Sequence, residues 1–193
     1  MNKTLGLFLS TLALTTHTNS QPPKSLHKAA KQGDITTLIT LLNKKRNINA
    51  RIWTGATPLH YAAKYGHYIC LSALVFCGAH INAIDKTGCT PLHYAAINGN
   101  LANMRLLLTN GANINAQNHI GQTPLHLALL NNNHQCVQLL RKASTSTSLA
   151  IINNQPSEKE AENSTHRRIL KLIADLLSEE IKEPPHQVQQ PLS

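Results

Sequence analysis

The chain has 193 residues, of which 41% are hydrophobic but only 4% aromatic, and its formal net charge is +9. No run of 18 or more apolar residues occurs, which argues against a transmembrane helix. Between residues 21 and 157 there are twelve Lys and Arg but only two Asp, so this part should attract acidic proteins, nucleic acid or acidic membranes.

The N-terminal segment differs from the rest of the chain. Lys3 is followed by thirteen uncharged residues, Thr4 to Thr16, and then by the small residues Thr18 and Ser20. A positive start, an apolar core too short to cross a bilayer and small residues after it are typical of a signal peptide. We therefore expect residues 1–20 to be removed near Ser20 and the protein to be periplasmic or secreted. The alternative is a hydrophobic leader that packs on the first repeat.

A motif with a fixed period begins at residue 26. The Leu-His pair at residues 26–27 returns at 59–60, 92–93 and 125–126, always after the same interval. Around it, TPLHYAA occupies residues 57–63 and 90–96, and TPLHLAL occupies 123–129. A period of about 33 residues indicates stacked units, each of which buries its apolar face against its neighbours.

The residues of each unit predict two short helices. Thr suits the N-cap of the first helix and the following Pro suits its first position, where a missing N–H costs nothing. Gly66 and Gly99 allow the left-handed backbone that ends the first helix, and Gly78 and Gly111 end the second in the same way. Pairs of Ala after each His leave room for neighbouring helices to approach closely.

These units resemble the ankyrin repeat family. The resemblance rests on TGATPLHYAAKYGH…GAHINA (54–83) and TGCTPLHYAAINGN…GANINA (87–116), and it extends over residues 24–143. The first unit lacks Thr-Pro, and the fourth starts with IGQTPLHLAL but has STSTS (144–148) in place of the closing Gly-Ala. The resemblance implies an all-α solenoid of helix-turn-helix units with projecting β-hairpin loops.

The expected organisation follows from this period. The first repeat spans 24–53, the second 54–86, the third 87–119, and the fourth, with a degenerate end, 120–152. A polar linker (153–165), an amphipathic helix (166–183) and a disordered tail (184–193) follow. Because residues 169–173 lie one period after residues 136–140, we expect the helix to cap the stack as half a repeat. Docking of that helix to a partner is the alternative.

The recurring histidines do not predict a metal site. One His per unit gives steps of roughly 8–10 Å, the spacing of packed helices, whereas zinc ligands all lie about 2 Å from one ion. The resemblance instead implies a hydrogen-bond network that braces the turns. Its members are Thr57 with His60, Thr90 with His93, and Thr123 with His126. We expect no metal and no cofactor.

Four cysteines are expected to be free thiols. Cys70 and Cys136 are two units apart, and Cys70 and Cys77 are about 10 Å apart along one helix, beyond the roughly 7 Å limit of a disulfide. A pair between Cys77 and Cys89 stays open. No nucleophile signature, phosphate loop or carboxylate pair is present, so we expect no enzyme.

The resemblance places the partner-binding surface on the concave face and the hairpin tips. The matching residues are Lys31, Gln32, Trp53, Thr54, Lys64, Tyr65, Lys86, Thr87, Ile97, Asn98, His119, Ile120 and Asn131. Trp53, the only Trp, is the expected anchor because Trp is favoured at interfaces. Its alternative role is packing under the hairpin of the first unit.

The leading hypothesis is a monomeric module that binds a protein, one that could be acidic, and no small-molecule substrate. A second hypothesis is an electrostatic binder of nucleic acid or acidic membrane. It rests on the basic N-terminal repeats, because seven of the twelve basic residues precede residue 52. Of these two classes, the protein partner is the one we expect.

Overall fold

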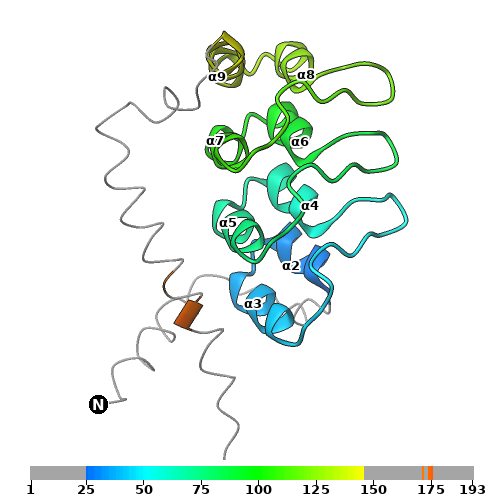
Figure 1. Ribbon diagram of the computed structural model, residues 1–193, viewed down its shortest axis with the longest axis vertical. Coiled ribbons are helices and arrows are strands. Elements are labelled where there is room, and N and C mark those ends of the chain that lie inside the picture. The colour runs from blue at the N-terminus through cyan, green and yellow to red at the C-terminus, as the bar shows by residue number, and fades with distance from the viewer. Residues whose placement is uncertain (1–24, 146–170, 172–173, 176–193) are drawn as a thin grey trace, which may run out of the picture.

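The computed structural model describes residues 25–145, together with residues 171, 174 and 175. Residues 25–145 form four stacked pairs of antiparallel helices, and all loops that join one pair to the next project on the same side (Figure 1). The pairs are α2 (Leu26–Gln32) with α3 (Ile35–Asn43), α4 (Pro58–Tyr65) with α5 (Tyr68–Phe76), α6 (Pro91–Ile97) with α7 (Leu101–Thr109), and α8 (Pro124–Leu130) with α9 (His134–Thr145). The predicted all-α repeat stack is confirmed.

The first helix of each pair starts where the sequence chemistry requires. In α4, α6 and α8 the Thr before the helix has extended backbone and Pro occupies the first helical position. In the first unit, which lacks Thr-Pro, the Ser25 side chain accepts a hydrogen bond from the Lys28 backbone N–H at 3.2 Å. A different cap therefore starts α2 at the equivalent position.

The first helices also end through contacts with the next unit. Gly66 has φ +77°, and a Cβ there would lie 3.0 Å from Oδ1 of Asn100. The Asn100 amide donates to the carbonyls of Ala63 and Lys64 at 2.8 and 3.1 Å. Glycine is thus needed both for the left-handed turn and for space, because the next unit supplies the side chain that satisfies the last carbonyls of α4.

The core is built from small and aliphatic side chains. The paired alanines of the first three units are fully buried between successive first helices. Leu38, Leu71, Leu74 and Leu107, on the second helices of the first three pairs, are fully buried in the same core. Such close contacts between neighbouring units explain why alanine recurs at these positions.

The projecting loops differ from the expected β-hairpins. Within residues 25–145 no β-strand is formed. Each loop tip is a tight turn, as at Asp85, whose N–H donates to the Cys89 carbonyl at 3.0 Å, while Gly88 N–H donates to the Asp85 carbonyl at 3.1 Å. Successive tips are joined by single backbone hydrogen bonds, from Lys86 N–H to the Thr54 carbonyl and from His119 N–H to the Thr87 carbonyl. These isolated bonds do not continue as a ladder, so the tips remain turns.

Two tip glycines provide a matched test of this link between loops. Gly88 and Gly121 are equivalent and have φ +78° and +77°, but a Cβ at Gly88 would lie 2.8 Å from the His119 backbone N, whereas nothing lies within 4 Å at Gly121. We expect Gly121→Ala to lower the free energy of unfolding by about 1 kcal/mol, the cost of a left-handed alanine. Gly88→Ala should cost a further ~1–3 kcal/mol because the next tip must shift. Urea unfolding of both variants measures the difference, and equal losses would contradict the role of the inter-loop contact.

The fourth unit departs from the others at both helix ends. Asn132 stands where the other units have Gly and adopts the same left-handed backbone, with φ +56°, which Asn tolerates better than most residues. α9 lacks a closing Gly, continues to Thr145 and has 12 residues, compared with nine in α3, α5 and α7. The segment STSTS therefore begins inside the helix. The first unit also lacks this Gly, but there Lys45 adopts the left-handed backbone, with φ +54°.

Several expectations fall outside the described residues. These are the signal peptide (1–20), most of the end of the fourth repeat, the linker (153–165), the tail (184–193) and nearly all of the helix at 166–183. Of that helix, Lys171, Ala174 and Asp175 are described, and all three are helical and exposed. No helix within the described part of the chain is long and apolar enough to cross a membrane.

Candidate functional site

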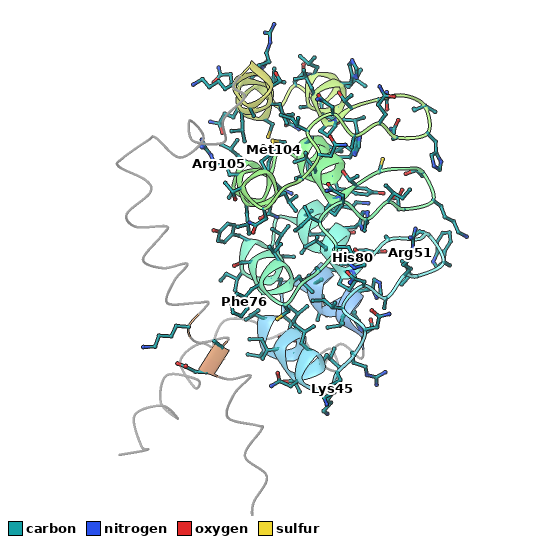
Figure 2. The ribbon with its side chains drawn as sticks, viewed as in Figure 1. Lys45, Arg51, Phe76, His80, Met104 and Arg105 are labelled. Atoms are coloured by element: carbon teal, nitrogen blue, oxygen red, sulfur yellow. The ribbon has the colours of Figure 1, made fainter. Side chains whose placement is uncertain are left out.

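The predicted binding residues lie in two groups. One group is on the loop tips, and the other is at the C-terminal ends of the first helices and just beyond them. Figure 2 places Arg51 on the loop side of the stack and Phe76, on a second helix, on the opposite side. The surface formed by the two groups is called the loop-side surface below.

The tips carry the most exposed large side chains of this surface. Trp53 is 82% exposed and Ile120 is 77% exposed. Lys86 and His119, which are equivalent to Trp53 in the next two tips, are also exposed. The alternative role for Trp53, packing under the first hairpin, is therefore wrong, and the indole presents its area to solvent.

Two of the predicted binding residues at the tips, Thr54 and Thr87, form hydrogen bonds that stabilise the tips. Thr87 donates from its N–H and its Oγ1 to Oδ1 of Asp85, at 2.8 and 2.6 Å. Thr54 is half-buried and its carbonyl accepts the bond from Lys86. These two residues therefore stabilise the backbone conformation of the tips that carry Trp53 and Lys86.

The helix-end group is exposed except for one member. Lys31, Gln32, Lys64 and Tyr65 are exposed, and Ile97 is half-buried. The two asparagines of this group are also exposed, but their amides donate to carbonyls of their own helices. These bonds run from Asn98 to Tyr94 at 2.9 Å and from Asn131 to Leu127 at 2.8 Å. The lysines and Tyr65 remain as the side chains best placed to contact another molecule.

Rings and ammonium groups alternate across this end of the surface. The Lys31 Nζ lies 5.5 Å from the Tyr65 ring centroid, and the Lys64 Nζ lies 5.9 Å from Tyr65 and 5.5 Å from Tyr94. Tyr61 and Tyr65 stack with centroids 6.2 Å apart and 3° between their planes. Cation–π contacts at these distances orient the ammonium groups without removing their charge.

Asp85 anchors the middle tip. Its side chain is 4% exposed, and it accepts from Cys89 N–H at 3.0 Å and from the Tyr94 hydroxyl at 2.6 Å in addition to both groups of Thr87. Burial alone would raise the pKa of this carboxyl, but the hydrogen bonds from Thr87, Tyr94 and Cys89 outweigh it and the net pKa is lowered. Burial and the Asp85 contact raise the pKa of Tyr94. This carboxylate is therefore charged, internally satisfied and closed to a ligand.

The histidines of the repeated motif lie inside the stack and connect its units. Thr90 N–H donates to His93 Nδ1 at 3.0 Å, so Nδ1 is unprotonated, and His93 Nε2 donates to the Gln122 carbonyl at 3.1 Å. Thr57 and His60 make the same contacts, with the Cys89 carbonyl as acceptor. Each of these two histidines thus links the N-cap Thr of its own unit to the residue that precedes the N-cap Thr of the following unit. This role is structural, and both ring nitrogens are occupied, so neither is open to a ligand.

The end units show the same arrangement in part. His27 has no Thr to cap, but its Nε2 lies 2.9 Å from the Ala50 carbonyl and 3.2 Å from the Ala56 carbonyl of the following loop. His126 accepts from Thr123 N–H at 3.1 Å and is exposed, because no further unit within residues 25–145 covers it.

The thiols and the other candidate ligands do not form a reactive cluster in the described residues. All four cysteines are free, and Cys70, Cys89 and Cys136 are buried. Burial raises the pKa of the Cys70 thiol to about 12, which keeps it protonated at neutral pH. Among the residues that the structure describes, no group of three His, Cys, Asp or Glu side chains is arranged to hold a metal ion.

Sequence reasoning missed three residues that support the loop-side surface from below, Tyr61, Tyr94 and Asp85. Tyr61 and Tyr94 belong to the repeated TPLHYAA, although the equivalent positions in the other units are Lys28 and Leu127. A position that varies within an otherwise constant motif is a candidate for binding, and this variation could have identified the two tyrosines from the sequence. Asp85 entered the sequence analysis only as a charge, yet Asp followed two residues later by Thr is a common turn-stabilising pattern.

The comparison with protein families decides the classification. The family described as ankyrin repeats (3 copies) matches residues 8–85, 26–118 and 70–150. The chain belongs to the ankyrin repeat family. Ankyrin repeats generally mediate protein–protein interaction, and proteins of this family are generally non-catalytic binding modules. A comparison with curated proteins finds no match to this chain.

Proposed function

We propose that this ankyrin repeat chain is a non-catalytic module that binds one protein partner through its concave face and loop tips. The observation that carries the proposal is Trp53, which is 82% exposed at a tip whose backbone is fixed by hydrogen bonds to the next loop. A large exposed aromatic on a rigid support is the kind of side chain that dominates binding energy at protein interfaces. Ile120 offers a second apolar contact, 77% exposed, two tips away.

The charge of the surface favours an acidic partner. Among residues 25–145 the only acidic side chains are Asp34 and Asp85, and both accept hydrogen bonds from residues two to four positions further along the chain. Asp34 caps α3 through Thr36 and Thr37, while Asp85 closes the middle tip. The exposed lysines of the loop-side surface therefore act without internal neutralisation, and they would speed and orient association with an acidic protein.

An electrostatic binder of nucleic acid or acidic membrane is supported less well. Such a ligand follows one continuous basic face, because many phosphates must be neutralised together. Here Lys44, Lys45 and Arg46 are exposed beyond the end of α3, whereas Lys31 is at the end of α2. The Arg51 guanidinium already donates to the Ile84 carbonyl of the next loop. The basic side chains are thus spread over separate parts of the first unit.

The proposal is tested by capture of the partner from an extract of the source cells. We expect the double variant Trp53→Ala/Ile120→Ala to retain less than a tenth of the partner bound by the unchanged chain, since each side chain is a large exposed contact. The matched control is Ile69→Ala/Phe76→Ala, which removes two side chains, 44% and 48% exposed, from the second-helix side. Loss of the partner from the control but not from the tip variant would overturn the proposed surface.

A further inference from the structure

Two lysines and three tyrosines form a cluster across three successive first helices. Its members are Lys31 on α2, Tyr61, Lys64 and Tyr65 on α4, and Tyr94 on α6. Three groups of these residues take part in structural hydrogen bonds: the Tyr94 hydroxyl donates to Asp85, and the backbone carbonyls of Lys31 and Lys64 accept from His67 and Asn100. The two lysine ammonium groups are not part of these bonds. The name Lys-Tyr cluster is used for these five residues.

The rings fix the positions of the two ammonium groups. Both nitrogens lie near the same ring, at 5.5 and 5.9 Å from the Tyr65 centroid, so their separation cannot exceed the sum of these two distances. Tyr65 itself stacks with Tyr61 and with His67, at centroid distances of 6.2 and 6.5 Å. The two charges are therefore preorganised, which lowers the entropy lost when an anion binds between them.

The cluster has two ammonium groups and contacts one carboxylate, that of Asp85, through the Tyr94 hydroxyl, so its net charge is positive. Asp85 keeps its negative charge, but it is 4% exposed and accepts four hydrogen bonds, none of them from a lysine. Asp34 is occupied at the start of α3. Two fixed positive charges without a facing carboxylate are complementary to a ligand that carries two negative charges at a similar spacing.

The spacing and the residue types narrow the ligand class. An extended peptide rises about 3.3 Å per residue and its side chains alternate between two faces, so carboxylates two residues apart share a face and span roughly 7 Å, within the limit set by the two nitrogens. Lysine contacts an anion as a point charge, so each ammonium group can meet one carboxylate of the peptide without fixing the plane of that carboxylate. Tyr65, 42% exposed, offers a ring face to the aliphatic parts of such a peptide.

We propose that the Lys-Tyr cluster binds an extended acidic peptide segment, with one carboxylate at Lys31 and another, two residues away, at Lys64. This inference rests on the proposed function, because it assigns a chemistry to the part of the partner that meets the first helices. The tips, with Trp53 and Ile120, contact the partner elsewhere.

The experiment measures binding of two labelled peptides to the full chain by fluorescence anisotropy at low and physiological salt. One peptide contains Glu-Ala-Glu between glycines, and the other has Gln in place of both Glu. We expect the Glu peptide to bind at least tenfold more tightly, with Kd rising as salt is added. Lys31→Met and Lys64→Met should each weaken its binding about tenfold, whereas Lys44→Met, which removes the same charge from an exposed site without ring contacts, should change Kd less than twofold.

Three outcomes would overturn this site. Equal weakening by Lys44→Met and Lys31→Met would mean that only net charge matters. Equal affinity for the Glu and Gln peptides would exclude carboxylate recognition. Tighter binding of an RNA oligonucleotide or of phosphatidylserine vesicles than of the Glu peptide, lost in the same two lysine variants, would assign the cluster to another ligand.

The test separates this site from the proposed function. If the Glu peptide is not bound but the partner is still captured in a Trp53-dependent manner, the Lys-Tyr cluster is overturned and the protein-binding function stands. If the Glu peptide is bound as expected but partner capture does not depend on Trp53 and Ile120, the cluster stands and the tip surface fails. Thermal unfolding confirms that each lysine variant is folded.

Discussion

Replacing His93 by alanine is expected to lower the free energy of unfolding by about 3–5 kcal/mol, the largest effect of any single change considered. The His93 ring is fully buried, so alanine leaves a cavity in the stack. It also removes the acceptor of the Thr90 N–H and the donor to the Gln122 carbonyl, and leaves both backbone groups unsatisfied. Urea unfolding followed by circular dichroism measures the loss.

His126→Ala is the matched control for this prediction. His126 occupies the same position in the fourth unit and accepts from Thr123 N–H, but it is exposed and makes no contact with a following unit within residues 25–145. Its replacement should cost only about 1 kcal/mol, the value of a helix cap. If the two variants lost equal stability, the connection between units through His93 Nε2 would not contribute as described.

Acidification from pH 7.5 to pH 5.5 is expected to destabilise the fold. Burial lowers the pKa of His27, His60 and His93 below the ordinary value of 6.5, and the hydrogen bonds of their rings to backbone carbonyls compensate only in part. For His60 the nearby Asp85 raises the pKa and Arg51 lowers it, both less than burial does. In the folded chain these rings stay neutral at pH values where the unfolded chain binds protons.

The free energy of unfolding falls on acidification because the unfolded chain binds more protons than the folded chain. The stability that these histidines contribute is fully present above pH 6.5 and is lost as pH falls from 6.5 toward their folded-state pKa values. Each of the three histidines adds to this loss as long as it stays neutral in the folded chain while the unfolded chain binds a proton. The lowered pKa values of Asp34 and Asp85 affect stability only below pH 3.8, a separate range.

Urea unfolding at pH 7.5, 6.5 and 5.5 measures the pH dependence directly. The His93→Gln variant lacks one of the three groups, so its loss of stability on acidification should be smaller than in the unchanged chain. A free energy of unfolding that stays constant or rises from pH 7.5 to 5.5 would contradict the neutral, buried state of these rings.

The stack itself could be predicted from the sequence because its determinants are local and periodic. Thr-Pro at the start of a helix and Gly at its end act within a few residues, so a single unit shows them. Repetition at a constant period then indicates how the units stack. The helix ends of α4 lie where Thr57 and Gly66 predict them.

The contacts across units could not be predicted in the same way. Asn100 closes the end of α4 from the next unit, and Lys31 lies against Tyr65 one unit away. Such contacts depend on how far one unit is rotated against its neighbour, which the period does not specify. The lysines and Tyr65 were expected on the surface, but their arrangement around one ring becomes visible only in three dimensions.

The fourth unit shows how the loss of one local signal changes the structure. The Gly that follows α5 and α7 is missing after α9, which continues for another three residues into the segment STSTS. In the first unit, which also lacks this Gly, Lys45 adopts the left-handed backbone and α3 ends after nine residues. The missing Gly is visible in the sequence, but what replaces the turn depends on helix propensity and on packing at the end of the stack. The expected hairpins likewise became turns because each tip forms too few paired hydrogen bonds for a strand.

The most direct test of the central claim is the affinity of the captured partner for the two double variants, measured by isothermal titration calorimetry. The account predicts that Trp53→Ala/Ile120→Ala raises Kd at least tenfold, while Ile69→Ala/Phe76→Ala changes it less than twofold. A tip variant that binds like the unchanged chain, together with a weakened Ile69→Ala/Phe76→Ala variant, would contradict the account and place the interface on the second helices.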